Sequence, residues 1–183
     1  MNNSSTGRIA AVVICGFLAT ACGGGGGSSQ SDSICTVIGG GAAQVAATPA
    51  ASFSNATAAF DGDLSSFGSL TTSSGTLRGT AQTGTMQTGG PYAGLAISTP
   101  AAGTLSVSIT TFLNGTQQDT GAVGSQSFGS SNVQNCNPGQ DCRVRNDLSY
   151  FGLRTTKNFD AIEAVLSYSG SASPLQIREL CIH

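Results

Sequence analysis

The stretch LSVSITTFLNG, residues 105–115, is the part of this sequence that decides the fold class. Its apolar residues Leu105, Val107 and Ile109 alternate with serines, which is the period of a strand with one buried face and one exposed face. A second apolar pair follows, and then Asn114-Gly115, which is a favoured two-residue turn of a β-hairpin. The stretch therefore predicts a half-buried strand that turns back on itself.

The same kind of pattern continues along the chain. Further strands are predicted at residues 150–154, 162–168 and 175–182, where short apolar runs are bounded by turn-forming residues. The stretches 84–94 and 121–135 are rich in Gly and Ser and are predicted to be loops. No segment has the period of an amphipathic helix, so an all-β sandwich is expected.

The composition limits the domain count and the class of partner. A chain of 183 residues fits one domain plus a leader. Only 9% of the residues are charged and the formal net charge is -2, so nucleic acid is not expected as a partner. The absence of Trp and the abundance of Gly, Ser and Thr fit a secreted β-rich protein.

The N-terminus has the pattern of a signal peptide. Met1 to Arg8 is polar with one positive side chain, and Ile9 to Ala21 is an uninterrupted run of apolar and small residues. This run is shorter than the ~20 residues that span a bilayer, but it has the length of a signal-peptide core. Residues 1–21 are therefore predicted to be a signal peptide.

The cleavage context predicts a lipid anchor. Residues 18–22, Leu-Ala-Thr-Ala-Cys, resemble a lipobox, in which the Cys22 thiol receives diacylglycerol. The alternative is an ordinary signal peptide that ends near Ala21. Five glycines and further polar residues follow, so residues 22–34 are expected to form a flexible tether. Because Gly23 lacks the retention signal that Asp would provide, the resemblance implies lipid anchoring in the outer membrane.

The cysteines predict two disulfide bonds. Of six cysteines, Cys15 leaves with the leader and Cys22 is acylated, so four remain in the folded domain. The remaining four are Cys35, Cys136, Cys142 and Cys181. In an oxidising compartment four cysteines form two disulfides, for which three connectivities are possible.

The spacing of these cysteines favours one connectivity. Cys136 and Cys142 flank Asn-Pro-Gly-Gln-Asp, a turn-forming stretch that brings them together, which leaves Cys35 to pair with Cys181. A zinc site would need further ligands at suitable spacing, and the one histidine is His183. A disulfide between the two ends of the domain, residues 35–183, is therefore expected.

One segment carries a family resemblance. Residues 55–67, NATAAFDGDLSSF, resemble the signature of discoidin-like, or galactose-binding-like, β-sandwich domains, the coagulation factor type C group and related carbohydrate-binding modules. The turn pattern of that family is matched by Asp61, Asp63 and Ser66, and its last-strand glutamate by Glu179. A weaker likeness covers residues 151–162. The resemblance implies a jelly-roll-like antiparallel sandwich, a structural calcium ion and a disulfide between the first and last strands.

The resemblance also implies a ligand set for Ca²⁺. The expected ligands are Asp61, Asp63, Ser66 and Glu179, with the carbonyl oxygens of Ala58 and Arg178. Calcium takes six to eight hard oxygen ligands, and two carboxylates on one tight turn repel each other without a cation. The alternative is a surface Asp-Gly-Asp turn that binds no metal. A bound ion would tie the first loop to the last strand and would have a structural role.

An enzymatic function is not expected. The sequence has no Gly-x-Ser-x-Gly motif, no interior histidine and no phosphate-binding loop. The remaining acidic pair, Asp160 and Glu163, lies beside a predicted strand and is expected to face solvent.

Binding of an extracellular ligand is the favoured function. Tyr92, in Gly-Gly-Pro-Tyr-Ala-Gly, is the best candidate for an exposed aromatic platform, with Arg78 and Asn114 as hydrogen-bonding partners. The alternative for Tyr92 is that it packs a loop, and the absence of Trp counts against tight glycan recognition. We expect an envelope-anchored lipoprotein that binds a surface glycan or another extracellular ligand. The alternative is a structural or adhesive surface protein that acts through protein contacts.

Overall fold

The computed structural model describes residues 34–37, 44–48, 53–71, 74–98, 102–128, 133–145, 147–170 and 174–183. The predicted signal peptide, Cys22 and nearly all of the predicted tether lie outside these residues. Ile34 is the exception, since it is 3% exposed and packs beside Cys35, so the packed domain includes this residue of the predicted tether. No helix in the described ranges is long and apolar enough to cross a membrane.

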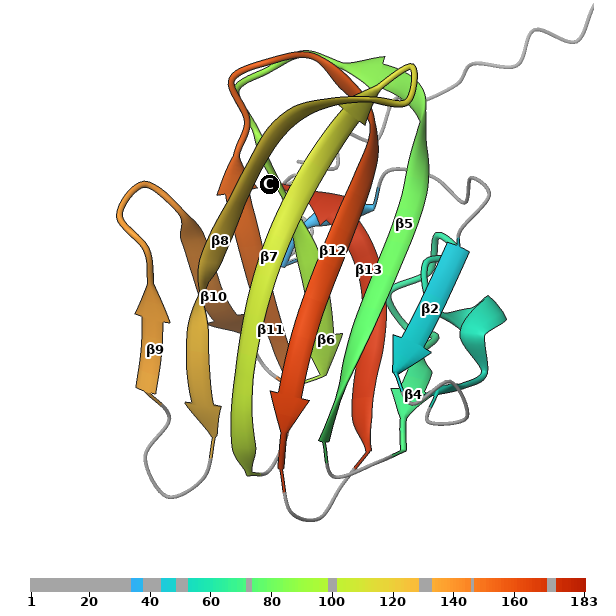
Figure 1. Ribbon diagram of the computed structural model, residues 1–183, viewed down its shortest axis with the longest axis vertical. Coiled ribbons are helices and arrows are strands. Elements are labelled where there is room, and N and C mark those ends of the chain that lie inside the picture. Colours follow the sequence, from blue (N-terminus) through green and yellow to red (C-terminus); the bar gives the residue numbers. More distant parts are fainter. Residues whose placement is uncertain are drawn as a thin grey trace, which may run out of the picture. The chain divides into compact units, whose positions relative to one another are not determined.

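The described strands form two antiparallel sheets that face each other as a sandwich, as predicted (Figure 1). The seven-stranded sheet contains, in spatial order, β10 (Asp141–Arg145), β11 (Leu148–Arg154), β6 (Tyr92–Ser98), β13 (Leu175–Ile182), β4 (Gly68–Leu70) and β3 (Phe53–Ser54), and β1 (Thr36–Val37) also pairs with β13. The six-stranded sheet contains β2 (Gln44–Thr48), β5 (Ser74–Gln87), β12 (Phe159–Ser169), β7 (Gly103–Leu113), β8 (Thr116–Phe128) and β9 (Val133–Cys136).

The predicted hairpin is confirmed. β7 and β8 pair in antiparallel register and are joined by Asn114 and Gly115, whose φ angles are 50° and 75°. Two positive φ angles in succession fit a type I′ turn, whose twist matches that of the flanking strands. The strands predicted at 150–154, 162–168 and 175–182 correspond to β11, β12 and β13.

The two predicted loops are wrong over most of their length. Residues 84–87 complete β5 and 92–94 begin β6, while 121–128 belong to β8 and 133–135 to β9. Gly124 shows the physical reason: a Cβ atom on it would lie 2.2 Å from the carbonyl oxygen of Asn135 on the paired strand. Glycine serves there to let two strands approach, and not to make a flexible loop.

A continuous apolar core fills the space between the sheets. Its largest fully buried side chains include Phe60, Phe151 and Phe159, with leucines and isoleucines from both sheets. A second, smaller cluster lies outside this core and consists of Ile34, Cys35, Ala96, Tyr150 and Cys181. The chain's first described residues therefore cover part of the outer face of the seven-stranded sheet.

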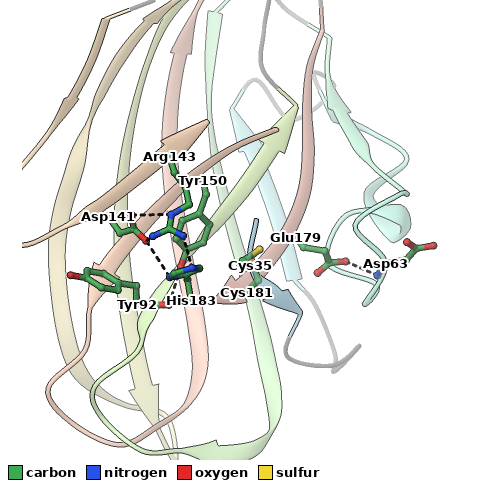
Figure 2. The surroundings of a disulfide bond; sticks show 9 residues. All are labelled: Cys35, Asp63, Tyr92, Asp141, Arg143, Tyr150, Glu179, Cys181 and His183. Carbon is green, nitrogen blue, oxygen red and sulfur yellow. Dashed lines mark hydrogen bonds and ion pairs between the residues drawn. A yellow bond between two sulfur atoms is a disulfide. The ribbon is translucent and has the colours of Figure 1, made fainter. Parts of the chain in front are cut away.

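Both predicted disulfides are present. Cys35 is bonded to Cys181, with their Cα atoms 5.8 Å apart, and Cys136 is bonded to Cys142. The first bond joins residues 146 positions apart and lies in the outer cluster (Figure 2). The two ends of the domain therefore meet at β1 and β13, as expected from the cysteine count.

Candidate functional site

A β-bulge in the last strand positions the candidate site. Ile177 of β13 is opposite Ile97 of β6, but Glu179 is opposite Ala96, so Arg178 has no partner of its own in this ladder. A bulge breaks the alternation of side chains between the two faces. Ala96 belongs to the outer cluster, and the side chain of Glu179 therefore lies on the same outer face.

Glu179 holds the loop of residues 55–67 against this face. Its Oε1 atom accepts a hydrogen bond from the backbone N–H group of Gly62 at 2.7 Å. It accepts a second one from the backbone N–H group of Asp63 at 3.2 Å (Figure 2). Gly62 has a φ angle of 96°, which glycine adopts without strain. Glu179 itself is only 1% exposed. A buried carboxyl group in the last strand thus binds a loop that lies more than a hundred positions earlier in the sequence.

Arg178 holds the same loop from its other side. Its carbonyl oxygen accepts a hydrogen bond from Phe60 N at 3.1 Å, and its Nη1 donates to the carbonyl oxygen of Ser65 at 2.6 Å. Its guanidinium also lies over the Phe67 ring, 4.7 Å from the centroid. Hydrogen bonds to a charged group are stronger than neutral ones, so this arginine fixes the course of the loop.

Phe60 anchors the loop in the core. Its side chain is 1% exposed although its φ angle is 65°, a left-handed conformation that is unusual for a bulky residue. Such strain persists only where the surrounding contacts determine the conformation. The burial of the ring and the bond to Arg178 supply these contacts, so the backbone on either side of Asp61 is held in place.

Four oxygen atoms converge at Ser66. The Ser66 Oγ atom lies 2.7 Å from Asp61 Oδ1, 2.9 Å from the carbonyl oxygen of Asp63 and 3.0 Å from the carbonyl oxygen of Ala58. A serine hydroxyl has one hydrogen, so it can donate to only one of these three acceptors. Two of these acceptors also have a backbone donor, because Asp63 N donates to Asp61 Oδ1 at 3.0 Å and Ser66 N donates to the Asp63 carbonyl oxygen at 3.2 Å. Carboxylate, carbonyl and hydroxyl oxygens gathered in this way are also the ligand chemistry of a hard cation such as Ca²⁺. The residues present fit the predicted ion.

Two of the predicted calcium ligands, the Asp63 carboxylate and the Arg178 carbonyl oxygen, have other hydrogen-bond partners in the structure. The Asp63 carboxylate accepts a hydrogen bond from Ser65 N at 2.7 Å, and it is the Asp63 carbonyl oxygen that faces Ser66. The Arg178 carbonyl oxygen is bonded to Phe60 N. In the described part of the chain, no three His, Cys, Asp or Glu side chains are grouped so as to hold a metal. The candidate centre therefore depends on carbonyl and hydroxyl oxygens as well as on carboxylates.

The two carboxyl groups of the site have opposite pKa shifts. Burial raises the pKa of Glu179 to about 7, and the neighbouring Asp61 carboxylate adds to this rise. The hydrogen bond from Ser66 lowers the pKa of Asp61 below its ordinary value. Asp61 is therefore the charged member of the pair in the metal-free protein, and Glu179 retains a proton up to near-neutral pH.

The three residues predicted to bind ligand lie on separate elements. Arg78 is in β5 on the outer face of the six-stranded sheet, where it pairs with Glu163 at 3.4 Å. Asn114 is in the β7–β8 turn, and its N–H donates to Asp160 Oδ2 at 3.0 Å. Tyr92 begins β6 in the opposite sheet. Asp160 and Glu163, predicted to face solvent, are half-buried and use these bonds to fix strand β12 to its neighbours.

Tyr92 has other neighbours, which the sequence did not indicate. Its backbone exchanges two hydrogen bonds with His183, and its carbonyl oxygen accepts a bond from the Tyr150 hydroxyl at 2.9 Å. Beside it Arg143 pairs with Asp141 at 2.7 Å and contacts the His183 ring (Figure 2). The Tyr92 side chain packs against the outer cluster. Hydrogen bonds and ion pairs join these polar groups to one another, although Asp141 Oδ2 has only ion-pair partners among the described residues, so the arrangement has the character of a structural cluster.

The fold and the oxygen cluster define an antiparallel β-sandwich with a candidate cation site between its 55–67 loop and its last strand. No protein-family model and no curated protein matches this chain. Among solved structures, the chain is similar to CpGH89CBM32-6 produced by Clostridium perfringens, with 12% identity and a TM-score of 0.37, over 77% of this chain and 92% of that chain. This likeness is distant, and the site described above rests on the residues of this chain alone.

Proposed function

We propose that this chain is an outer-membrane lipoprotein, anchored through Cys22, whose β-sandwich is a calcium-stabilised, non-catalytic module that binds an extracellular glycan. The observation that carries the proposal is the single Ser66 hydroxyl among three oxygen acceptors. Residues 55–67 resemble galactose-binding-like domains, which hold a calcium ion at the corresponding turn. The oxygen atoms around Ser66 lie at this turn and therefore support the same role here. Glycan binding follows from the same resemblance.

The cation would be held by oxygens from both ends of the chain. The candidate ligands are the carbonyl oxygens of Ala58 and Asp63, the Asp61 carboxylate, the Ser66 hydroxyl and the Glu179 carboxylate. When bound, Ca²⁺ would supply positive charge that holds these oxygens together, and it would take the place of the proton on Glu179. The ion would thus stabilise the packing of the 55–67 loop against β13.

Thermal unfolding tests the metal site. We expect 1 mM CaCl₂ to raise the Tm of the protein above its value in a chelator, because a ligand at about 100 times its Kd stabilises the folded state by about 2.7 kcal/mol. The variant Asp61→Ala should lose this rise. The matched control is Asp147→Ala, which removes an exposed carboxylate outside the site and should retain it. Equal melting curves for the unmodified protein with Ca²⁺ and with chelator would refute the site.

A glycan array in the presence of Ca²⁺ tests the binding function. A binding module should give saturable signals on a defined set of glycans, whereas a protein that acts through protein contacts should give none. The lipid anchor is tested separately by mass spectrometry of chain extracted from membranes. Diacylglycerol on Cys22 is expected. Its absence would indicate that the leader is an ordinary signal peptide and that the protein has no lipid on Cys22.

A further inference from the structure

On the outer face of the six-stranded sheet, one chemical type repeats from strand to strand. Ser167 of β12 is opposite Thr76 of β5 and Ser106 of β7, and Ser106 is opposite Ser125 of β8. Ser125 is in turn opposite Asn135 of β9. Directly opposite residues point to the same face with Cβ atoms about 5 Å apart. The sheet therefore presents a row of hydroxyl groups that ends in an amide.

The surface is hollowed along this row. A groove of about 360 Å³ is lined by side chains that include Ser106, Ser108, Ser125, Ser167, Asn135 and Asn137. A second hollow of about 320 Å³ shares Ser106, Ser125 and Ser167 with the first, so the two are continuous. None of the described residues that line either hollow is charged. The volume lies at the small end of the range for ligand sites, which is about 300–1,000 Å³.

The hydroxyl groups in the groove are free to bind a ligand. Ser106, Ser125 and Ser167 are exposed, and within the described ranges their side-chain hydroxyl groups make no hydrogen bond to another residue. Arg78 is opposite Val165 at the edge of the groove, and its charge is paired with that of Glu163. The groove thus offers neutral groups that can both donate and accept hydrogen bonds.

One wall of the groove is held by a disulfide and by hydrogen bonds to β8. Asn135 and Asn137 flank Cys136, whose disulfide with Cys142 closes a short loop. Asn137 fixes this loop to β8, because its backbone N donates to Val123 O at 2.9 Å and its Nδ2 to Ala122 O at 2.8 Å. A wall held in this way loses little conformational entropy when a ligand binds.

We propose that this groove is where the domain binds its glycan, and that the glycan is a neutral oligosaccharide. The inference rests on the proposed function and names its binding surface. Sugar hydroxyls donate and accept hydrogen bonds as the serine hydroxyls and amides of the groove do, and an uncharged lining offers no counter-ion for sialylated or sulfated sugars. Tyr168 is the one aromatic residue in the described lining, and it is only 3% exposed and donates its hydroxyl hydrogen to the carbonyl oxygen of Ala102, so binding depends on several hydrogen bonds along the row.

Four variants of the full chain test this inference. Ser106→Ile places a bulky side chain at the centre of the groove, and Ser125→Val does so on the next strand. Thr76→Ile is the matched control, because Thr76 is exposed in the same row but lines neither hollow. Tyr92→Ala tests the alternative ligand surface in the opposite sheet.

The unmodified protein and each variant are applied to an array of neutral, sialylated and sulfated oligosaccharides. The oligosaccharide that binds most strongly is then titrated by calorimetry, and the melting curve of each variant serves as a folding check.

We expect neutral oligosaccharides to bind, and both groove variants to weaken binding at least tenfold. Thr76→Ile and Tyr92→Ala should stay within twofold of the unmodified protein. If glycans bind but the groove variants do not weaken them, or if Tyr92→Ala abolishes binding, the groove is wrong and the proposed function stands. Binding confined to sialylated or sulfated glycans would overturn the assigned ligand class. If no glycan binds the unmodified protein, the groove and the proposed function both fail.

Discussion

The charge state of Glu179 affects the stability of the metal-free protein. Its folded pKa of about 7 lies above the ordinary value of 4.5, so the folded state binds the proton more tightly than the unfolded state. The free energy of unfolding therefore decreases as pH rises from about 4.5 to about 7, by up to about 3 kcal/mol. Urea unfolding with chelator at pH 4.5, 6 and 7.5 measures this decrease.

The variant Glu179→Gln isolates this contribution. A neutral amide cannot titrate, so the variant should lack the part of the pH dependence that belongs to Glu179. Groups that do not interact with Glu179 titrate in both proteins and cancel in the comparison. Parallel pH profiles for the two proteins would show that Glu179 is not protonated in the folded state.

Gln126 is a buried polar residue that costs stability. Its side chain is 1% exposed, and neither of its side-chain polar atoms has a hydrogen-bond partner in the described part of the chain. An unsatisfied buried amide costs about 1–3 kcal/mol, so Gln126→Leu should raise the free energy of unfolding by about 1–2 kcal/mol. The control Gln82→Leu, at an exposed position in β5, should change it by less than about 0.5 kcal/mol. A loss of stability in Gln126→Leu would contradict the prediction.

Among the elements, β8 depends on glycine for its pairing with β9. A Cβ atom at Gly124 would meet the Asn135 backbone, whereas at Gly121 the nearest atom, at 3.1 Å, is the end of the Leu153 side chain, which can turn aside. Gly124→Ala should therefore destabilise the protein by about 1–3 kcal/mol, and Gly121→Ala by much less. Thermal unfolding of both variants checks this difference. Equal Tm values would show that β9 can shift without loss.

The bulge in β13 determines the face of the sheet on which Glu179 lies. Without it, the strand alternation would turn Glu179 toward the core and Leu180 away from it. With it, Leu180 packs in the main core while Glu179 faces the 55–67 loop. One unpaired residue thus lets a single strand serve both the core and the candidate cation site.

For the molecule as a whole, the two disulfides should contribute unequally to stability. The entropy of loop closure increases with the number of residues enclosed, and the separations are 146 residues for Cys35–Cys181 and 6 for Cys136–Cys142. The loop-closure relation gives about 5 kcal/mol for the long loop and about 2 kcal/mol for the short one. Replacing each pair by serines and measuring urea unfolding tests the order. A larger loss for the short loop would contradict it.

Much of the fold could be read from local patterns. The alternation at 105–109, the Asn114-Gly115 turn and the turn between Cys136 and Cys142 each depend on residues close together in the sequence, so their structures were predicted correctly. The resemblance of residues 55–67 to a family signature likewise depends on residues that are close together in the sequence. Such features are local because a turn or a strand face is set mainly by nearby side chains.

The remaining features depend on partners that are distant in the sequence. The glycines of β8 were mistaken for a loop because only β9 shows why they are needed, and the bulge that orients Glu179 exists only against β6. The groove likewise arises from serines on three strands that no spacing relates. Cross-strand register brings these residues together, and register is a property of the folded sandwich, because it is set by packing between segments far apart in the chain.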